Sequence, residues 1–585
     1  MSRTAAWLAL VLALVMFACM PLATRSRAQS LQSLNAGNKA SAEIIRKVNN
    51  GQGSERVRVI IQPRGGWSGE LDAALHGAGA SDQRQFQNFD LRVVSLPAWA
   101  AANLALRSDV AYVSINKEMR TLGHVSTTSG ADAVRATAGT TTSGLDGTGI
   151  GIAVIDSGVD TSHKAFLDKS NALRVVAGVD FTGEGRTDDP YGHGTHVASI
   201  LAGNGRISNA TYTGVAPNAN IVNLRVLNSQ GVGTTASLLR ALDWVLQNRA
   251  RFNIRVVNLS LGMLAIESYR NDPACMAVRR VVDAGIVVAA AAGNNGRGAD
   301  GGKVYGHIHS PGNEPSALTV GAANTYGTDA RADDGVASYS SRGPTRSYHT
   351  DPAGVRHYDN LVKPDLVAPG NKIVNAQAVA NHLVAQNPSL DAGVSPVDNR
   401  KQMYLNGSSM ATPVTAGAAA LMIQANPTLT PNLVKALLMY SAQPLAGFNY
   451  FEQGAGQVNV EGAVRLALLV RTDLLASTPL GDPLLKAAVP PEPRTTIAGH
   501  TFTWSRGLVL HFNYVTGVEL ITKFQKVYGL GRLLGDGVIT GDGVITGDGV
   551  ITGDLFVQAQ SAAVNGDETA AMAAEPDDGV DCLDY

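Results

Sequence analysis

Three residue types that together hydrolyse amide bonds occur in this chain in a fixed order, each among small neighbours. They are Asp156, His193 and Ser409, in the phrases Val-Ile-Asp-Ser-Gly, Gly-His-Gly-Thr-His and Gly-Ser-Ser-Met-Ala. A serine hydroxyl becomes a strong nucleophile at neutral pH only when a neighbouring imidazole takes its proton. A carboxylate holds that imidazole in the required tautomer. The three residues therefore predict a nucleophile, a general base and an orienting acid, provided that the fold brings them together.

Acyl transfer also needs hydrogen-bond donors for the negative charge that develops on the substrate's carbonyl oxygen. The small residues that follow Ser409, with Pro413 among them, predict the start of a helix that has the proline in its first turn. The backbone N–H of Ser409 would then face that charge. Asn294 lies in the phrase Ala-Ala-Gly-Asn-Asn-Gly, directly after an apolar run. Taken alone, that phrase would be only a turn.

The order Asp, His, Ser and these phrases resemble the subtilisin-like serine proteases, over residues 126–466. The resemblance implies that Asn294 donates to the oxyanion. It also implies that a substrate-binding segment of Ser260, Leu261 and Gly262, together with Gly293, pairs with an extended peptide by strand addition.

Several other polar residues near these phrases have a structural as well as a functional interpretation. The resemblance places His309 just before a pocket-wall loop, where it either selects the substrate side chain before the cleaved bond or is a solvated loop residue. His196 and His163 are expected to be structural. Asp188 and Asp189 either shape the substrate groove or are solvated. An extra segment, residues 376–402, leaves the distances in that groove open.

Composition limits the function classes. The 585 residues are 45% hydrophobic and 16% charged, with a formal net charge of −1, so nucleic acid is not a favoured partner. Three cysteines imply no disulfide framework. Cys275 shares a helical face with three valines, which indicates a buried free thiol, although a disulfide with Cys582 stays open.

The N-terminus carries a targeting pattern. An uncharged apolar run after Arg3 ends near Ser-Arg-Ala, which predicts a signal peptide over residues 1–28, cut after Ala28. The alternative is an uncleaved membrane anchor, because the run is long enough to span a bilayer. With cleavage, we expect a secreted, extracellular protein with no stable membrane span; the periplasm and the cell surface are the alternative locations.

Four regions follow from the patterning. After the signal, residues 29–122 contain strand patterns at 57–61, 91–96 and 110–115, with a short helix at 102–106. By its position this small α+β domain resembles the inhibitor-like propeptide of the family, and the alternative is an N-terminal domain that stays attached. Residues 123–468 form the predicted catalytic domain, and residues 469–585 a C-terminal extension.

The catalytic region alternates apolar strand patterns with amphipathic helix patterns. Strands are predicted at 150–155, 219–227, 255–261, 286–292 and 317–320, and most are continuously apolar, as parallel strands covered on both faces are. The fold class is therefore α/β: a subtilisin-like, doubly wound, mostly parallel sheet with helices on both faces. Catalytic residues of such sheets gather at the carboxyl ends of the strands, where Asp156 is expected.

The C-terminal extension contains a perfect Gly-Asp-Gly-Val-Ile-Thr repeat between residues 535 and 554. Its aspartates have one of two interpretations: they line a stacked β structure that binds Ca²⁺, or the repeat is a low-complexity duplication in a flexible tail. The acidic, Ala-rich end is expected to be partly disordered. No cofactor is required for the predicted chemistry; a structural Ca²⁺ is expected only from the family, with unknown ligands.

The sequence predicts a secreted serine endopeptidase that acts on polypeptides through an acyl-enzyme intermediate. It would be made as a self-processing zymogen, with its own propeptide as intramolecular inhibitor, and would be a monomer. Two alternatives stay open: a catalytically silent surface or binding protein on a subtilisin-like scaffold, and an esterase or acyl transferase that shares the chemistry.

Overall fold

The computed structural model divides the chain into two compact units, residues 1–120 and 121–585. It describes residues 39–86, 90–116, 124–136 and 144–534, and the backbone of three short strands, β21 (Val538–Ile539), β22 (Ile545–Thr546) and β23 (Phe556–Gln558). The predicted signal, the Asp series of the repeat and Cys582 lie outside the described residues. Each unit has a hydrophobic core of its own.

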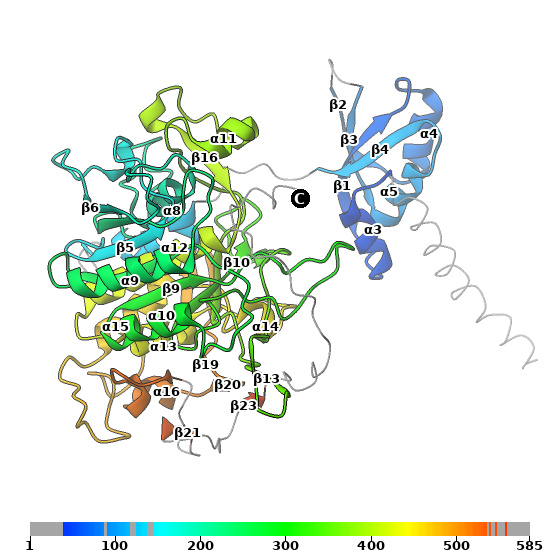
Figure 1. The fold of residues 1–585 in the computed structure, drawn as a ribbon. Helices are drawn as coiled ribbons and strands as arrows, with labels where there is room; N and C mark the ends of the chain where they lie inside the picture. Colours follow the sequence, from blue (N-terminus) through cyan, green and yellow to red (C-terminus); the bar gives the residue numbers. More distant parts are fainter. Residues whose placement is uncertain are drawn as a thin grey trace, which may run out of the picture. The chain divides into compact units, whose positions relative to one another are not determined.

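The first unit, blue in Figure 1, is a small α+β domain. Its antiparallel sheet has the order β2-β3-β1-β4. The strands are β1 (Arg56–Pro63), β2 (Ser81–Gln85), β3 (Arg92–Pro97) and β4 (Val110–Ile115), and the helices are α3 (Ala42–Asn49), α4 (Gly69–Gly77) and α5 (Ala98–Ala105). Alternating exposed and buried residues along β1 place one face of the sheet on the core that these helices cover. The three predicted strands are present, and β2, which is fully exposed, has no apolar pattern that could have revealed it.

The second unit is built on an eight-stranded sheet with the order β11-β10-β9-β8-β5-β7-β6, in which β14 also pairs with β10. All pairings are parallel except that of β10 with β11. The strands are β5 (Gly151–Asp156), β6 (Val175–Asp180), β7 (Asn220–Arg225), β8 (Ile254–Leu259), β9 (Val287–Ala291), β10 (Leu318–Asn324), β11 (Gly335–Val336) and β14 (Leu366–Pro369). The central strands are buried along their whole length, which confirms the predicted mostly parallel α/β sheet.

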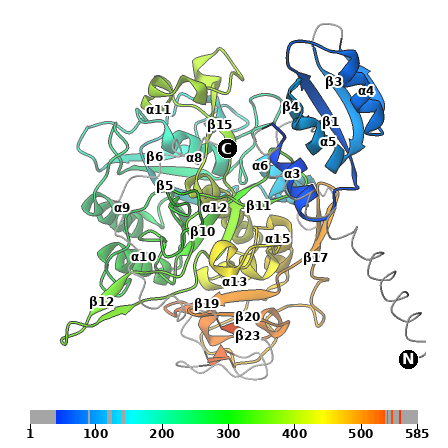
Figure 2. The same cartoon turned by 90° about the vertical axis from the view of Figure 1, so that its right-hand side faces the viewer.

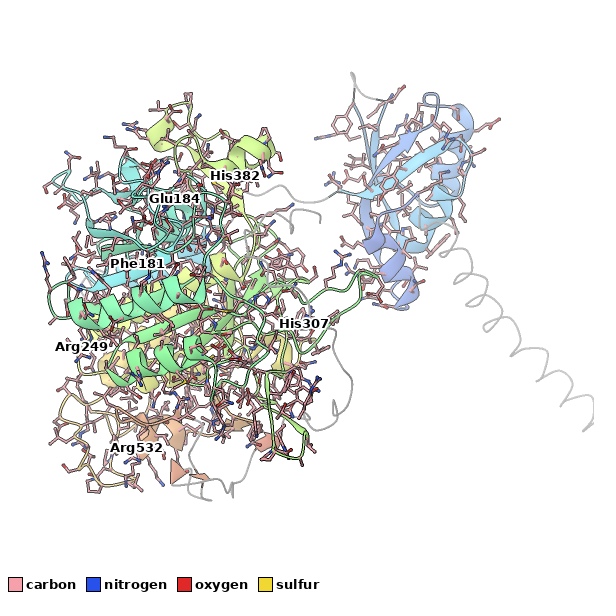
Figure 3. The ribbon with its side chains drawn as sticks, in the orientation of Figure 1. Phe181, Glu184, Arg249, His307, His382 and Arg532 are labelled. Atoms are coloured by element: carbon pink, nitrogen blue, oxygen red, sulfur yellow. The ribbon has the colours of Figure 1, made fainter. Side chains whose placement is uncertain are left out.

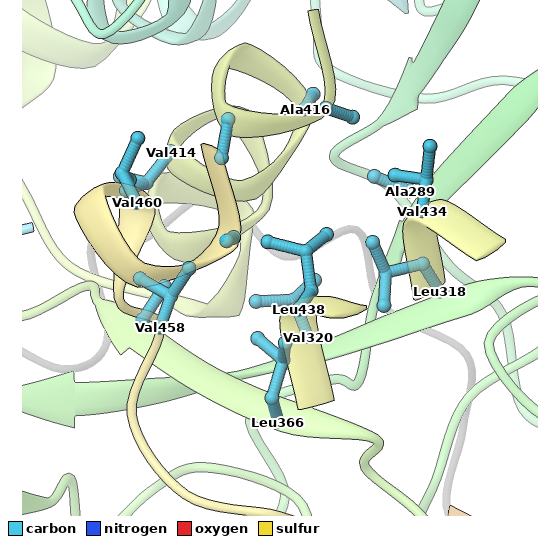
Figure 4. Packing of buried hydrophobic residues seen from close by; sticks show 14 of the residues in the cluster. Ala289, Leu318, Val320, Leu366, Val414, Ala416, Val434, Leu438, Val458 and Val460 are labelled. Carbon is cyan, nitrogen blue, oxygen red and sulfur yellow. The ribbon is translucent and has the colours of Figure 1, made fainter. Parts of the chain in front are cut away.

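Helices cover both faces of this sheet (Figures 1 and 2). Helices α9 (Thr235–Asn248) and α10 (Pro273–Asp283) pack on one face; α8 (His193–Ala202), α12 (Ser408–Ala425), α13 (Pro431–Ser441) and α15 (Val460–Leu469) pack on the other. In Figure 4, apolar side chains of α12 and α13 meet those of β9, β10 and β14. Helix α12 is buried over nearly its whole length, so the helix that begins beside Ser409 is anchored in the core.

Smaller elements complete the unit. They are the helices α6 (Val125–Thr128), α7 (Ala131–Ala136), α11 (His382–Gln386) and α14 (Tyr450–Gln453), and the paired strands β12 (Tyr348–Thr350) with β13 (Arg356–Tyr358) and β15 (Ile373–Ala376) with β16 (Gln402–Leu405). Within the described residues, 3₁₀ turns lie at Lys164–Phe166, Pro388–Leu390, Asp398–Arg400 and Lys526–Tyr528.

The described part of the C-terminal extension shares the core of the sheet and its helices. It contains β17 (Arg494–Ile497), β18 (His500–Thr503), β19 (Gly507–Leu510), β20 (Asn513–Thr516) and α16 (Glu519–Thr522). Trp504, Leu508 and Tyr528 belong to the same buried cluster as α12, α13 and α15. Residues 470–534 therefore stabilise the helix layer behind the sheet, although their composition gives no sign of it; the four predicted domain limits stay predictions.

Candidate active site

The carboxyl ends of three neighbouring strands lie at one edge of the sheet. Asp156 ends β5, Ser260 follows β8, and Asn294 follows β9, and these strands are adjacent in the order β9-β8-β5. Parallel strands end on the same side of a sheet, so three residues separated by up to 138 positions (294 − 156) come to one edge.

Asp156 and His193 are hydrogen-bonded. His193 Nδ1 lies 2.7 Å from Asp156 Oδ1, and each side chain is only 1% exposed. The same carboxylate oxygen accepts a bond from the Ser157 N–H at 2.7 Å. A carboxylate on Nδ1 selects the tautomer that carries its proton there and leaves Nε2 as the basic nitrogen. The geometry is the one that an orienting acid and a general base require.

Glycines let the Asp156 and His193 segments approach each other closely. A Cβ on Gly194 would lie 2.2 Å from the carbonyl oxygen of Gly158. Gly192, which precedes α8, has a φ of 108°, a conformation that side chains rarely adopt. The small residues beside the histidine are therefore a steric condition for the bond between His193 and Asp156.

Ser409 lies in the first turn of α12 and exchanges two hydrogen bonds with Ser260. Ser409 Oγ donates to the Ser260 carbonyl at 3.0 Å, and Ser260 Oγ donates to the Ser409 carbonyl at 2.7 Å. Pro413 explains the second bond. Its N–H would be the helical partner of the Ser409 carbonyl, but proline has none. The Ser260 hydroxyl takes the place of the missing donor.

Pro413 lies in the second turn of α12, because the helix begins at Ser408, and the prediction of a first-turn proline was wrong by one turn. The Ser260 side chain is fully buried and faces α12. Of the predicted substrate-binding segment, only the backbone of Ser260, Leu261 and Gly262 is therefore available for pairing with a peptide.

Asn294 is oriented by the residue before Ser409. Its Oδ1 accepts a bond from the Ser408 N–H at 2.9 Å, and the Gly293 N–H donates to Ser408 Oγ at 3.0 Å. With Oδ1 on the α12 backbone, the amide nitrogen lies on the opposite side of the same planar group. The loop after β9 and the start of α12 are thus bonded to each other through Ser408.

His309 packs between two glycine backbones. A Cβ on Gly262 would lie 2.9 Å from His309 Cβ, and a Cβ on Gly293 would lie 2.7 Å from His309 Cδ2. The Nε2 atom bonds to Asn295 Oδ1 at 2.6 Å, and the side chain is 7% exposed. Burial, with a smaller contribution from His307, lowers the pKa of His309 to about 4. The alternative of a solvated loop histidine was wrong: the ring closes the space between the two glycines.

The other histidines of the sequence analysis have structural positions. His196 Nε2 lies 3.1 Å from the Ile373 carbonyl and 3.2 Å from the Met403 carbonyl. Burial lowers its pKa to about 3. His163 Nδ1 accepts a bond from the Ala165 N–H at 3.2 Å, at the start of a 3₁₀ turn. Both contacts agree with a structural role.

Asp188 and Asp189 are adjacent but have opposite surroundings. Asp188 is exposed and pairs with Arg186, and the hydrogen bond from this guanidinium lowers the pKa of Asp188. Asp189 is 2% exposed and accepts bonds from Ser157 Oγ at 2.8 Å and from the Gly192 and Thr195 N–H groups at 2.8 and 2.7 Å. Burial raises the pKa of Asp189 despite these bonds. Sequence reasoning did not separate the two residues.

The extra segment 376–402 packs against the residues just before His193. The His382 N–H donates to the Pro190 carbonyl at 2.8 Å, and the His382 ring stacks on Tyr191 with centroids 5.9 Å apart. Figure 3 labels His382 on α11. Asn381 lies so close to Gly192 that a Cβ there would meet its Oδ1 at 2.6 Å. The segment therefore supports the loop that leads into α8.

Cysteine and metal predictions have different outcomes. Cys275 is buried and free, as predicted, and its thiol lies 3.1 Å from Asn313 Oδ1. Within the described residues, no group of three or more His, Cys, Asp or Glu side chains could hold a metal ion. The described side chains thus offer no such calcium site, and the Asp repeat stays a prediction. In that same part of the chain, no helix is long and apolar enough to span a membrane.

Comparison with known proteins identifies the scaffold. Residues 147–460, more than half of the chain, match the Subtilase family (peptidase S8). The serine protease AprX of Bacillus subtilis (strain 168) is 34% identical over 328 residues, which are 55% of this chain and 67% of AprX. Subtilisin DY of Bacillus licheniformis is 30% identical over 328 residues, 55% of this chain and 93% of that protein.

A crystal structure of a cold adapted subtilisin-like serine proteinase shares 31% identity, covers 54% of this chain and 89% of its own, and has a TM-score of 0.37. The family match and the two protease relatives carry the assignment. The chain belongs to the subtilase family and is a serine-type endopeptidase.

Proposed function

We propose that Asp156, His193 and Ser409 are the catalytic triad of this endopeptidase, with Asn294 as an oxyanion donor. The observation that carries the proposal is the buried 2.7 Å bond between His193 Nδ1 and Asp156 Oδ1, at the sheet edge where Ser260 and Asn294 bond to the start of α12. The fold does not need a buried pair of an acid and an imidazole at the end of a strand, but a serine nucleophile needs such a pair to lose its proton.

In the first half of the reaction, Ser409 Oγ attacks the carbonyl carbon of the substrate and its proton passes to His193 Nε2. Asp156 keeps the imidazolium in place and stabilises its charge. The oxyanion accepts bonds from the Asn294 side-chain amide and the Ser409 N–H. The C–N bond then breaks, the proton on Nε2 goes to the leaving amine, and an acyl-enzyme remains on Ser409.

In the second half, water attacks the acyl carbon while His193 takes one of its protons. The tetrahedral intermediate is held by the same two donors. Its collapse returns the proton to Ser409 Oγ and releases the carboxylic acid product. No metal or redox cofactor enters these steps; a structural Ca²⁺ stays a separate, family-based proposal.

The substrate is an extended polypeptide. The backbone of Ser260, Leu261 and Gly262 would pair with it on one side, and Gly293 would bind it on the other. His309 fills the space between Gly262 and Gly293, so we propose that it limits the size of the substrate side chain that enters there.

The N-terminal unit is proposed to be the propeptide of a secreted zymogen. Residues 1–120 form a compact unit with a core of its own, which a removable folding domain requires. Residues 1–28 would be the export signal, and residues 29–122 would be cut away by the enzyme itself after they have inhibited it. The mature enzyme is proposed to be a monomer.

A fluorophosphonate probe tests the nucleophile, because it loses fluoride and forms a bond to phosphorus only with an activated serine oxygen. Wild-type protein should be labelled at Ser409, and Ser409→Ala should not be labelled. The same variant, expressed alone, should keep its N-terminal unit by intact-mass measurement, whereas the wild type loses it. Labelling at another serine, or processing of pure Ser409→Ala, would refute the respective parts of the proposal.

A further inference from the structure

We propose that Asp189 is a positioning residue for His193: its buried carboxylate fixes the start of α8, and thereby the imidazole, against the Asp156 segment. This inference rests on the proposed function of His193 as the general base. It concerns a buried acid that the catalytic steps do not use.

The first support is the set of donors that Asp189 satisfies. One carboxylate oxygen accepts from the Gly192 N–H and from Ser157 Oγ, each at 2.8 Å, and the other accepts from the Thr195 N–H at 2.7 Å. Gly192 and Thr195 lie on either side of His193. The first N–H groups of a helix have no partner within the helix, so the carboxylate supplies what α8 lacks.

The second support is Ser157, which joins the two segments. Its hydroxyl donates to Asp189 and accepts a bond from the Gly194 N–H at 2.9 Å. Its carbonyl accepts a bond from the buried Arg225 Nε at 2.9 Å. Ser157 follows Asp156 directly, so Asp189 and Ser157 connect the backbone around the acid to the backbone around the imidazole.

The third support is that the turn between Asp189 and His193 is also fixed from outside. The N–H groups of His382 and Leu383 donate to the carbonyls of Pro190 and Tyr191 at 2.8 and 3.2 Å. The carbonyls of this turn therefore stay bonded to residues 382 and 383 when the Asp189 carboxylate is removed. The backbone that should move is the start of α8, which carries His193.

A carboxylate suits this position because three donors converge on it. The two carboxylate oxygens can accept all three bonds, whereas an asparagine has a single acceptor oxygen. The negative charge also lies beside a helix start that becomes positively charged when His193 takes up a proton.

The test compares Asp189→Ala and Asp189→Asn with Asp188→Asn as the matched neighbour, all processed in trans by a trace of wild-type enzyme. For Asp189→Ala, we expect kcat to fall by about 10²-fold, the cost of a misplaced catalytic group. KM should stay near the wild-type value, because no residue that touches the bound substrate has changed. Asp189→Asn should lose less, and Asp188→Asn nothing.

Two further measurements separate positioning from loss of fold. The rate of fluorophosphonate labelling at Ser409 should fall by the same factor as kcat, counted per folded molecule by circular dichroism. The proton resonance of His193 Nδ1 should shift or broaden in Asp189→Asn. Folded Asp189 variants with wild-type labelling rates and an unchanged resonance would overturn the inference. A wild type that is never labelled at Ser409 would instead refute the proposed function.

Discussion

The starts of α8 and α12 carry the two side chains that we propose to react. A charged group bonds to one helix start, and neutral groups bond to the other. The α8 start, which bears His193, is bonded by a buried carboxylate, Asp189. The α12 start, which bears Ser409, is bonded by neutral groups, the Asn294 amide and the Ser260 hydroxyl. The first N–H groups of both helices have no partner within the helix itself, so helix geometry alone does not explain the difference.

The charge that the proposed reaction would create accounts for the difference. His193 becomes an imidazolium, which nearby carboxylates stabilise, whereas the substrate oxygen near Ser409 becomes an anion, which a carboxylate would repel. Neither helix has an acidic residue in its own first turn, and the acid at α8 comes from the turn just before that helix. The comparison teaches that the sign of the charge at each helix start follows the charge that the chemistry creates there.

The largest expected effect comes from removing the reacting groups themselves. Ser409→Ala and His193→Ala should each lower kcat by about 10⁶-fold, and the double variant should be no worse, because the two residues act as a unit. Steady-state kinetics with a peptide substrate measures this. Losses that multiply in the double variant would mean that the two helix starts act independently.

Changing the neutral amide of Asn294 at the start of α12 should have the next largest effect on kcat. Asn294→Ala removes one oxyanion donor and should lower kcat by about 10²–10³-fold. Asn294→Asp keeps the shape but adds a negative charge, so it should be worse than the alanine variant. If the aspartate variant were the better enzyme, charge would not be what distinguishes the two helix starts.

The neutral bond from Ser260 to α12 can be broken and then repaired. Ser260→Ala removes the hydroxyl that donates to the buried Ser409 carbonyl and should lower the free energy of unfolding by about 1–3 kcal/mol. Pro413→Ala restores a backbone N–H and should cost less in the Ser260→Ala background than alone. All four proteins of this cycle, which are the parent, the two single variants and the double variant, would also carry Ser409→Ala so that they cannot digest themselves. Denaturant unfolding then measures the free energy of unfolding of each. If the losses of unfolding free energy in the two single variants simply add up in the double variant, the restored N–H at residue 413 does not replace the Ser260 hydroxyl.

The smallest effect concerns the neutral imidazole of His309 beside Gly293. Burial lowers its pKa from 6.5 to about 4. Between these pH values the unfolded chain binds a proton that the folded chain does not, so stability falls as the pH falls from 6.5, by about 1 kcal/mol per pH unit. His309→Gln should remove this part of the slope. The difference in unfolding free energy between the two proteins at pH 7 and pH 5 measures it, and parallel pH profiles would contradict it.

Much of the sheet could be predicted because its central strands are continuously apolar, and Asp156 lies directly after such a run. The packing of residues 470–534 could not be predicted, because their apolar residues are scattered and only become a core through contact with α13 and α15. Asp189 was indistinguishable from Asp188 in sequence, since burial depends on which side of the turn faces Ser157.

The sequence by itself determined which residue types are available for the proposed reaction, their order, and the strands and helices that carry them. The periodicity of apolar residues and the phrases of small residues are local properties of the chain. Only the tertiary structure decided what surrounds each group: the carboxylate at α8, the hydroxyl that replaces the missing N–H of Pro413, and the imidazole between Gly262 and Gly293. The hydroxyl contact joins residues 149 positions apart. The carboxylate lies just before α8 in the chain, but it is also bonded to Ser157, 32 positions away. Hydrogen bonds between distant groups leave no periodic signal in a sequence.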